Sequence, residues 1–398
     1  MFLPLLLSLL LPAFYELLPP TARALVWLLG ATGLLATGLP LLRQTVWWIR
    51  IFDFPRLQIV IGLVLALAGA LALGWQTADA GPLRLSFTVA LGLALGYQIL
   101  RILPYTPLHR KQVADSVRPN EPRAQLSLAV MNVLQYNRQG ARALATLRAA
   151  DPDVIMAVET DTWWHEQLRP LEVTHPHVCH EPLGNTYGLL FFSRLPLRQC
   201  QIKYLLDSDI PSLHTYVQLP DGLTWVRLYG LHPKPPAPQE AKTSTKRDAE
   251  LLLVGKEVDR RDEPTIVFGD MNDVAWSHTS ELFRRVSGLL DPRVGRGLMP
   301  TFHAEHRFLR WPLDHVFVSA HFQVVKMERL PYVGSDHFPI FVRLSYEPQH
   351  KVQQEENAEQ ANVEDHEEAN EKIAEGFAEE AQEEELAVSF EQLLPWAN

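Results

Sequence analysis

The sequence predicts an α/β domain that follows an α-helical transmembrane region and precedes an acidic C-terminal tail. Three observations support this prediction. The first hundred residues are almost entirely apolar, the middle of the chain alternates strand-like runs with helical stretches, and residues 351–398 are rich in Glu, Gln and Ala. The domain boundaries that we expect are 1–103 for the membrane helices, 104–124 for a juxtamembrane linker, 125–347 for the α/β domain and 348–398 for the tail.

The charge of the chain is concentrated at its C-terminal end. The 398 residues have a net charge of −10, but residues 351–398 contain fifteen Asp or Glu and two Lys, which leaves +3 for the other 350 residues. Because the body of the protein is close to neutral, its bulk charge neither favours nor excludes a polyanionic substrate.

The N-terminal region contains apolar segments of the length that a helix needs to cross a bilayer. We expect three or four transmembrane helices, at Phe2–Leu18, Ala24–Leu42, Gln58–Trp75 and Leu85–Leu103. The first segment has an alternative interpretation as a signal-peptide core, although no basic residue precedes it and no small-residue cleavage site follows. A buried bundle of a soluble protein is the other alternative, which the scarcity of charged faces disfavours.

The basic residues of this region predict an orientation in the membrane. Arg43, Arg50 and Arg56 lie between the second and third segments, further Arg and Lys residues follow the fourth, and the intervening loop carries only Asp79. By the positive-inside rule, both basic stretches and the α/β domain lie in the cytoplasm. The basic linker has two interpretations, contact with anionic head groups or ordinary solvated charge.

From Gln125 onward the sequence alternates strands and helices. Short β-branched and aromatic runs bounded by turn residues predict strands, and Ala- and Leu-rich stretches predict helices. We expect helices at Gly140–Ala150 and Lys246–Arg260, and strands at Leu126–Met131, Val154–Val158, Tyr187–Ser193, Leu213–Leu219, Leu223–Leu231, Thr265–Phe268, Leu313–Val318 and Ile340–Leu344.

The strand Thr265–Phe268 ends in the most informative stretch of the chain. Gly269 permits a tight turn, and Asp270 and Asn272 follow directly. A carboxylate and a carboxamide two residues apart on a rigid strand end can hold a cation and a phosphate or water. The alternative is a solvated turn, since Gly, Asp and Asn are ordinary turn residues.

The same arrangement recurs along the domain. Each single residue has an ordinary interpretation as a loop carboxylate or a hydrogen-bonded histidine, but strand ends on one rim of a sheet converge. We therefore predict a site formed by the polar residues at strand ends, which are Asn132, Glu159, His232, Asp270, Asn272, Asp314, Asp336 and His337.

These residues lie in motifs that resemble the endonuclease/exonuclease/phosphatase superfamily, the group that contains DNase I, the abasic-site endonucleases, inositol polyphosphate 5-phosphatases and neutral sphingomyelinases. The motifs are MNVLQYN, IMAVETDTWW, YGLLFFSRLPL, LYGLHPKPP, VFGDMND, PLDHVFVS and GSDHFPI, and they run from Leu126 to Leu344 in the family's order. With the apolar N-terminal region, the sequence resembles bacterial membrane-anchored members of unassigned substrate. The resemblance implies a four-layered α/β sandwich, with two mixed sheets packed together and helices outside.

The resemblance also implies a divalent metal site. Glu159 matches the family's conserved glutamate and would bind Mg²⁺, with Mn²⁺ as an alternative. Asn132 would help to orient the metal or the phosphate, and Asp336 would lie near the metal. A metal neutralises charge on phosphoryl oxygens, which phosphodiester cleavage requires.

The catalytic roles implied by the resemblance fall on five residues. Asp270 would orient the attacking water and Asn272 would hold the scissile phosphate. His337 would act as acid–base or phosphate-contacting group, oriented by Asp314. His232 would stabilise phosphoryl oxygens or assist the leaving group. These residue types supply the positioned water and the histidine–carboxylate pair that the reaction needs.

We expect a membrane-anchored, divalent-metal-dependent phosphoesterase that cleaves phosphodiester bonds in nucleic acid or in a lipid head group. The alternative is a catalytically silent membrane scaffold that binds a protein partner through its acidic tail. Two departures from the family weaken any transfer of substrate choice: Gly230-Leu231 precedes His232, and His315 follows Asp314 where many relatives have an aromatic residue.

Several features leave their interpretation open. Three roles are open for Trp163 and Trp164: stacking on a base, contact with lipid, or packing. The loop with His303, His306, Arg307 and Arg310 either binds phosphate or carries ordinary surface charge. Cys179 and Cys200 either pair or remain buried thiols. The tail is expected to be disordered or loosely helical, with Phe390, Leu393, Leu394 and Trp396 as a short docking element or as frayed chain. The resemblance implies a bacterial inner membrane; it favours an extracytoplasmic domain, opposing the charge rule.

Overall fold

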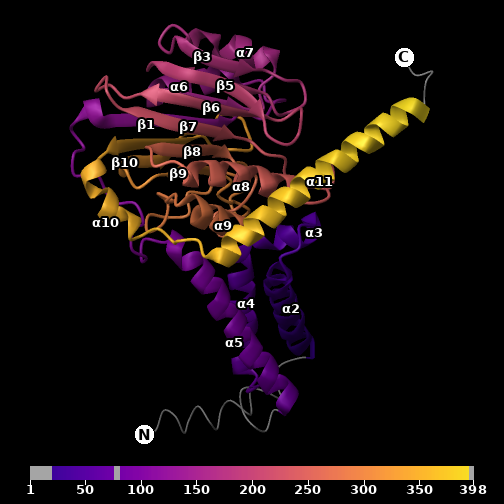
Figure 1. The fold of residues 1–398 in the computed structure, drawn as a ribbon. Helices are drawn as coiled ribbons and strands as arrows, with labels where there is room; N and C mark the ends of the chain where they lie inside the picture. The colour runs from indigo at the N-terminus through magenta and orange to yellow at the C-terminus, as the bar shows by residue number, and fades with distance from the viewer. Residues whose placement is uncertain (1–19, 76–80, 394–398) are drawn as a thin grey trace. The chain divides into compact units, whose positions relative to one another are not determined.

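The computed structural model describes residues 20–75 and 81–393, which form two compact units. The first unit extends to Pro104 and the second comprises Tyr105–Asn398. Figure 1 shows the helices of the first unit and the layered sheets of the second. The expected membrane segment Phe2–Leu18 lies outside the described residues.

The N-terminal unit is helical. Its helices are α2 (Pro20–Gly38), α3 (Trp47–Arg50), α4 (Arg56–Ala72) and α5 (Pro82–Ile102), with 3₁₀ turns at Leu39–Leu42 and Ile51–Asp53. Leu63, Ala66 and Leu91 are buried where the long helices meet. A Cβ atom added at Gly33 would lie 2.7 Å from a Leu63 methyl carbon. Glycine therefore allows the close helix approach that is typical of membrane bundles.

Two helical segments of this unit are long and apolar enough to cross a membrane, Pro20–Leu42 and Pro82–Tyr105. They correspond to the second and fourth expected segments. The third, in α4, qualifies together with the preceding helix Trp47–Asp53, from which it is bent by 73°. The buried guanidinium of Arg56 is paired there, since it donates to Asp53 at 2.8 Å and to Gln98 at 2.9 Å. Pairing of this kind is required of a charge buried among apolar helices.

The second unit is built on two mixed β-sheets (Figure 1). The six-stranded sheet has the order β10-β11-β1-β2-β4-β3 and the five-stranded sheet the order β5-β6-β7-β8-β9. The strands are β1 Gln125–Asn132, β2 Val154–Val158, β3 His177–Glu181, β4 Leu189–Ser193, β5 Leu197–Tyr204, β6 Pro211–Gln218, β7 Trp225–Leu231, β8 Thr265–Asp270, β9 Asp314–Val318, β10 Phe322–Arg329 and β11 Ile340–Tyr346.

Helices cover the outer faces of both sheets. The six-stranded sheet packs against α6 (Gly140–Ala150) and α7 (Thr162–Leu168), and the five-stranded sheet against α8 (Thr245–Asp259) and α9 (His278–Ser287). The inner faces form one apolar core, in which Val130, Met156 and Phe268 are fully buried. Central strands buried on both faces explain the continuous apolar runs of the sequence. The predicted four-layered DNase I-like sandwich is confirmed.

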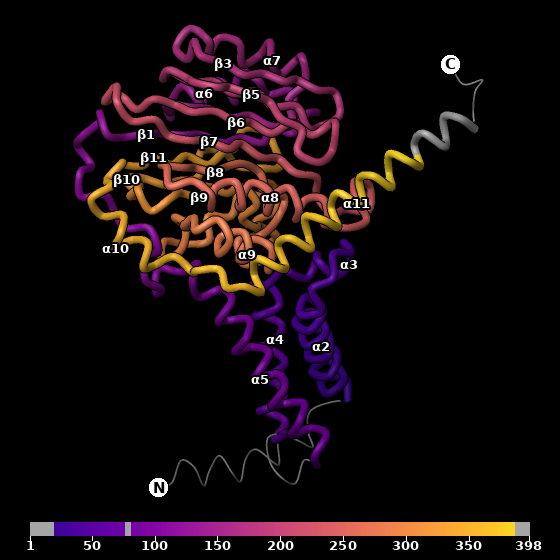
Figure 2. Tube along the Cα trace, in the orientation of Figure 1, coloured from indigo at the N-terminus to yellow at the C-terminus, as the bar shows by residue number. Residues whose placement is uncertain are grey.

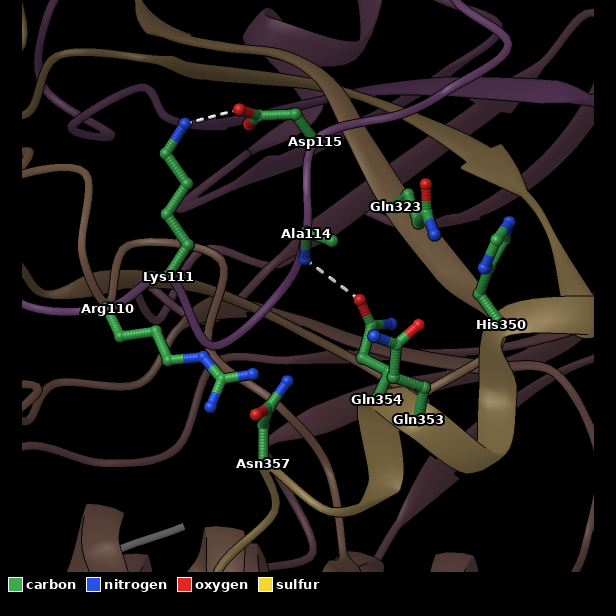
Figure 3. A pocket seen from close by; sticks show the side chains of 9 residues that line it. All are labelled: Arg110, Lys111, Ala114, Asp115, Gln323, His350, Gln353, Gln354 and Asn357. Carbon is green, nitrogen blue, oxygen red and sulfur yellow. Dashed lines mark hydrogen bonds and ion pairs between the residues drawn. The ribbon is translucent and has the colours of Figure 1, made fainter.

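Residues 105–124, expected to be a linker, are instead part of this unit. Val113 is fully buried in the core between the sheets. The Asp291 amide donates to the Gln112 side chain at 2.9 Å, and the Ala114 amide donates to Gln354 at 2.9 Å. Figure 3 shows the Ala114 contact beside a cavity of about 370 Å³, which is lined by Arg110, Lys111, Ala114, Asp115, Gln323, His350, Gln353, Gln354 and Asn357.

The acidic tail is helical, so of the two forms that the sequence left open, disordered or loosely helical, the structure has the helical one. After the short helix α10 (Lys351–Glu355), the chain forms α11 (Val363–Leu393), and Figure 2 traces it past α9 and α8. Glu and Ala have high helix propensity. The acidic face of the helix also pairs with cations and histidine on α8 and α9, through Lys246–Glu380, Lys246–Glu383, Arg285–Asp365 and His278–Glu368. The expected docking side chains Phe390, Leu393, Leu394 and Trp396 lie outside what the structure describes.

Cys179 and Cys200 form a disulfide. The bond joins β3, at the edge of the six-stranded sheet, to β5, at the edge of the five-stranded sheet. Of the two alternatives that the sequence left open for these cysteines, the structure has the paired form.

Candidate active site

The predicted site residues meet at one rim of the two sheets. β1 and β2 run parallel, so Asn132 and Glu159 follow neighbouring strand ends. β7 and β8 are also parallel and bring His232 beside Asp270. β9 runs antiparallel to β8, with Asp314 in register with Asp270. An antiparallel strand begins where its neighbour ends, which is why a residue at the start of β9 joins the same rim.

Asn132 connects the two sheets at this rim. Its Nδ2 donates to Glu159 Oε1 at 2.6 Å and to Asp270 Oδ2 at 3.0 Å. The amide of Leu134 donates to Asn132 Oδ1 at 2.9 Å, which fixes the orientation of the carboxamide. One neutral side chain thus holds two carboxylates from different sheets at a defined separation.

His337 lies between two carboxylates. Its Nδ1 is 2.8 Å from Asp314 Oδ2 and its Nε2 is 3.4 Å from Asp270 Oδ2. Burial alone would lower the pKa of His337, but the Asp270 and Asp314 carboxylates outweigh it and raise the pKa to about 10. The imidazole is therefore protonated at neutral pH and can donate from both nitrogens. Burial raises the pKa of Asp270, although the charge of His337 opposes that shift.

The turn after β8 places Asn272. Gly269 has a φ of 147°, and a Cβ atom at this position would lie 1.9 Å from the Leu231 carbonyl oxygen, so only glycine fits. The Asn272 amide donates to Asp270 Oδ1 at 3.0 Å. Its side-chain Nδ2 donates to the Pro233 carbonyl at 3.0 Å, which ties this turn to the loop after β7.

His232 is a neutral histidine beside these groups. Burial lowers its pKa to about 4, even though the nearby Asp270 carboxylate favours the charged form. Its Nδ1 is buried and makes no hydrogen bond within residues 20–75 and 81–393. The ring centroid lies 5.4 Å from that of Tyr187. His232 can therefore donate or accept one hydrogen bond but carries no charge at neutral pH.

Glu159 and Asp336 lie on the more open side of the site. Glu159 keeps partial solvent contact, yet loss of hydration raises its pKa to about 7, and Asn132 only partly offsets this effect. Asp336 is also partly exposed; its carboxylate accepts from Ser335 Oγ at 3.3 Å, and its charge acts on both Glu159 and His337. A bound cation would favour the ionised form of Glu159.

The residues present fit a hard divalent cation. Such ions prefer oxygen ligands, and Glu159 and Asp336 supply carboxylate oxygens, while Asn132 Nδ2 donates to Glu159 and fixes its position. Ligand atoms of Asp270, Asp314 and His337 also lie within 4.8 Å of one another. Asp314 Oδ1 is buried and has no hydrogen-bond partner among the described residues, so the site contains an oxygen whose lone pairs the protein leaves unused.

Three residues beside the site escaped the sequence prediction. Tyr187 donates to Glu240 at 2.9 Å, Arg247 donates to the Asn272 carbonyl at 2.7 Å, and the Phe302 ring lies 4.9 Å from His337. Tyr187 is the first residue of the YGLLFFSRLPL motif, so its position beside the site could have been predicted from the sequence. Arg247 offers none, since Lys246, Arg247 and Asp248 are consecutive and all buried, so helical periodicity hides them.

The fold and this rim of carboxylates, amides and histidines define a DNase I-like protein with an acid–base and metal-compatible site. The sequence model of the Endonuclease/Exonuclease/phosphatase family matches residues 129–337, and the chain belongs to that family. Its members are hydrolases that act on phosphate esters. The matched range contains all eight predicted site residues.

Solved structures of low sequence identity resemble the chain. A protein of this family from Beutenbergia cavernae is 19% identical over 56% of this chain and 72% of its own, with a TM-score of 0.47. A family protein from Bacteroides thetaiotaomicron is 19% identical over 57% and 97%, with a TM-score of 0.47. D. rerio TDP2 complexed with a single-strand DNA product is 17% identical over 56% and 99%, with a TM-score of 0.45. No curated protein sequence matches.

Proposed function

We propose that this chain is a membrane-anchored, divalent-metal-dependent phosphodiesterase. The observation that carries the proposal is the array in which His337 contacts Asp314 and Asp270, while Asn132 joins Asp270 to Glu159. A histidine held between two carboxylates, next to a third carboxylate on the open side, supplies acid–base groups and cation ligands in one place.

The metal would be Mg²⁺ or Mn²⁺, held by Glu159 with Asn132 and Asp336. When bound, it neutralises the charge that develops on the phosphoryl oxygens. Asn132 would position Glu159, because its carboxamide is itself fixed by the Leu134 amide.

The protein's own groups would manage the protons and the phosphate. Asp270 would accept a hydrogen bond from the attacking water and take its proton, since burial makes this carboxylate more basic. His337 would donate to a phosphoryl oxygen, with Asp314 holding its orientation. Asn272 would hold the scissile phosphate, and neutral His232 would contribute a hydrogen bond to the phosphoryl or leaving oxygen.

The substrate would be a phosphodiester in nucleic acid or in a lipid head group. Nucleic acid is one candidate substrate, since the similar structure of D. rerio TDP2 contains a single-strand DNA product. The apolar helices Pro20–Leu42 and Pro82–Tyr105 would instead bring the domain to lipid phosphodiesters. Substrate choice in this fold depends on the loops around the site, so an assay must cover both classes.

The test uses the full chain in detergent micelles with Mg²⁺ or Mn²⁺, assayed in parallel on plasmid DNA, RNA, sphingomyelin and phosphoinositides. We expect one class to be hydrolysed and Asp270→Ala to lower the rate about 10²- to 10⁴-fold. Asp259→Ala, at an exposed position of α8, is the matched control and should retain wild-type activity. Hydrolysis that persists in Asp270→Ala or in EDTA would refute this mechanism.

The rival function is a silent scaffold whose acidic tail binds a partner. Five acidic residues of α11, Asp365, Glu368, Glu379, Glu380 and Glu383, pair with side chains of the same domain, for example Asp365 with Arg285 at 2.8 Å. This observation favours an enzyme with a docked helix over a free partner-binding tail. A folded, metal-loaded protein that cleaves none of the four substrates would reverse that preference.

A further inference from the structure

A second group of metal-compatible side chains lies outside the active site, on the outer layer of the six-stranded sheet. It consists of His165 on α7, Glu172 after the 3₁₀ turn Arg169–Leu171, and His180 on β3. Figure 1 shows α7 and β3 together at one edge of the second unit. None of these residues has a role in the proposed hydrolysis.

The three side chains converge on one point. His165 Nε2 lies 3.8 Å and His180 Nε2 3.7 Å from the same oxygen, Glu172 Oε1. The two rings lie 4.9 Å apart between centroids, at an interplanar angle of 65°. In a tetrahedral zinc site with bonds of about 2.0–2.1 Å, ligand atoms lie about 3.3–3.4 Å apart. The two nitrogen–oxygen separations are within a few tenths of an ångström of this value, and all three ligand atoms lie within 4.8 Å of one another.

The polar groups of this cluster are not satisfied by one another. A separation of 3.7 Å is too long for a hydrogen bond between His180 and Glu172. Both ring nitrogens of His180 are buried, and the described part of the chain provides neither with a hydrogen-bond partner; a metal ion would bind at Nε2. A core histidine normally has such a partner, whereas a ligand nitrogen that faces a metal position does not need one.

The chemistry of the donors selects the metal. Two imidazole nitrogens and one carboxylate are a common protein ligand set for zinc, whereas Mg²⁺ prefers oxygen ligands only. The side chains of His165 and Glu172 are 31% and 38% exposed, so the site is open to an ion from solution and to a water as fourth ligand.

We propose that His165, Glu172 and His180 form a Zn²⁺ site that is separate from the catalytic metal. The bound ion would clamp α7 to the edge strand β3. α7 begins three residues after Glu159, and its N-cap Asp161 accepts a hydrogen bond from the Trp164 amide at 2.9 Å. The bound ion would therefore stabilise the helix that follows the loop at Glu159. This inference does not depend on the proposed hydrolysis.

The experiment titrates Co²⁺, a spectroscopic substitute for Zn²⁺, into the chelator-stripped full chain in detergent with excess Mg²⁺. We expect one tetrahedral Co²⁺ spectrum from the wild type. His165→Gln and Glu172→Gln, at partly exposed positions, should weaken this binding at least about tenfold. His177→Gln, at an exposed position of the same strand β3, is the matched control and should bind like the wild type. Zn²⁺ should raise the melting temperature of the wild type but not of His165→Gln.

Two results would overturn the site. One is a wild type whose Co²⁺ affinity and spectrum equal those of His165→Gln. The other is a signal that disappears in Asp270→Ala and persists in His165→Gln, because that pattern assigns the ion to the catalytic rim. The melting temperature without metal separates a lost ligand from a misfolded variant, since a ligand substitution should leave it within a few degrees of the wild type.

Discussion

In the proposed mechanism Asp314 acts through His337, whose Nδ1 lies 2.8 Å from the Asp314 carboxylate. Its carboxylate helps to raise the pKa of that imidazole to about 10, against the effect of burial. We predict that Asp314→Asn lowers kcat about 10²-fold or more and moves the alkaline limb of the pH–rate profile to lower pH, because His337 then loses its proton more easily. The profile of kcat/KM against pH measures both effects. An unchanged alkaline limb would show that His337 does not act as the protonated group.

His214 provides a pH-dependent contribution to stability away from the site. Burial, with Lys203 and Arg227 nearby, lowers its folded-state pKa to about 3, well below that of an unfolded chain. The unfolded state therefore binds the extra proton, and the free energy of unfolding falls as pH drops below about 6.5. For one such group, the free energy of unfolding falls by about 2 kcal/mol between pH 7 and pH 5.

The variant His214→Gln removes this titration and keeps a polar side chain beside Ser212, which contacts the His214 ring at 3.1 Å. Chemical denaturation at pH 7 and pH 5, followed by tryptophan fluorescence, should show a smaller acid loss for this variant than for the wild type. His177→Gln, exposed on β3, should keep the wild-type slope. Equal slopes for His214→Gln and the wild type would contradict the linkage.

Helix α11 is attached to the domain through charge pairs on α8, and Lys246 is their centre. The Lys246 ammonium is buried and contacts Asp207 at 2.6 Å and Glu383 at 2.6 Å, as well as Glu380. We predict that Lys246→Ala destabilises the unit by about 3 kcal/mol, because it leaves the buried Asp207 carboxylate, with Glu380 beside it, without its cation. Denaturant unfolding measures the loss, and limited proteolysis detects release of α11. Lys256→Ala, whose side chain reaches exposed Asn370, should have little effect.

The strands that the sequence analysis missed, β3, β5 and β10, lie at the edges of the two sheets and are partly exposed. The central strands β2, β4 and β8 are buried along their whole length and were predicted from apolar runs. The edge strand β3 has no buried residue, and β5 is also partly exposed throughout, with a register irregularity between Arg198 and Gln201. Polar edge strands give weak sequence signals because only pairing with a neighbour makes them strands.

At the scale of the whole molecule, the domain extends beyond the expected boundaries of 125 and 347. Tyr105 is buried and donates to the Ala275 carbonyl at 2.6 Å. Gln354, in α10, donates to the carbonyls of Ala320 at 2.9 Å and Phe322 at 2.6 Å. Both ends therefore complete the packing and the hydrogen bonds of the core.

We predict that a fragment Tyr105–Asn398 folds cooperatively, whereas Pro122–Pro348 is several kcal/mol less stable, since it lacks buried Val113 and leaves core carbonyls without donors. Circular dichroism melting of the two fragments measures the difference in stability, and the full chain is the reference. Identical melting temperatures would show that the added segments are dispensable.

The sequence by itself determined the family, the central strands, the helix Gly140–Ala150 with its bounds, and the eight residues of the candidate site. These features depend on local patterns, namely apolar runs, turn residues and polar groups at strand ends. Only the tertiary structure decided that α11 packs on the domain as a helix, that residues 105–124 belong to the domain, and that His165, Glu172 and His180 lie close together. Each of these depends on contacts between segments far apart in the chain, which no local periodicity encodes.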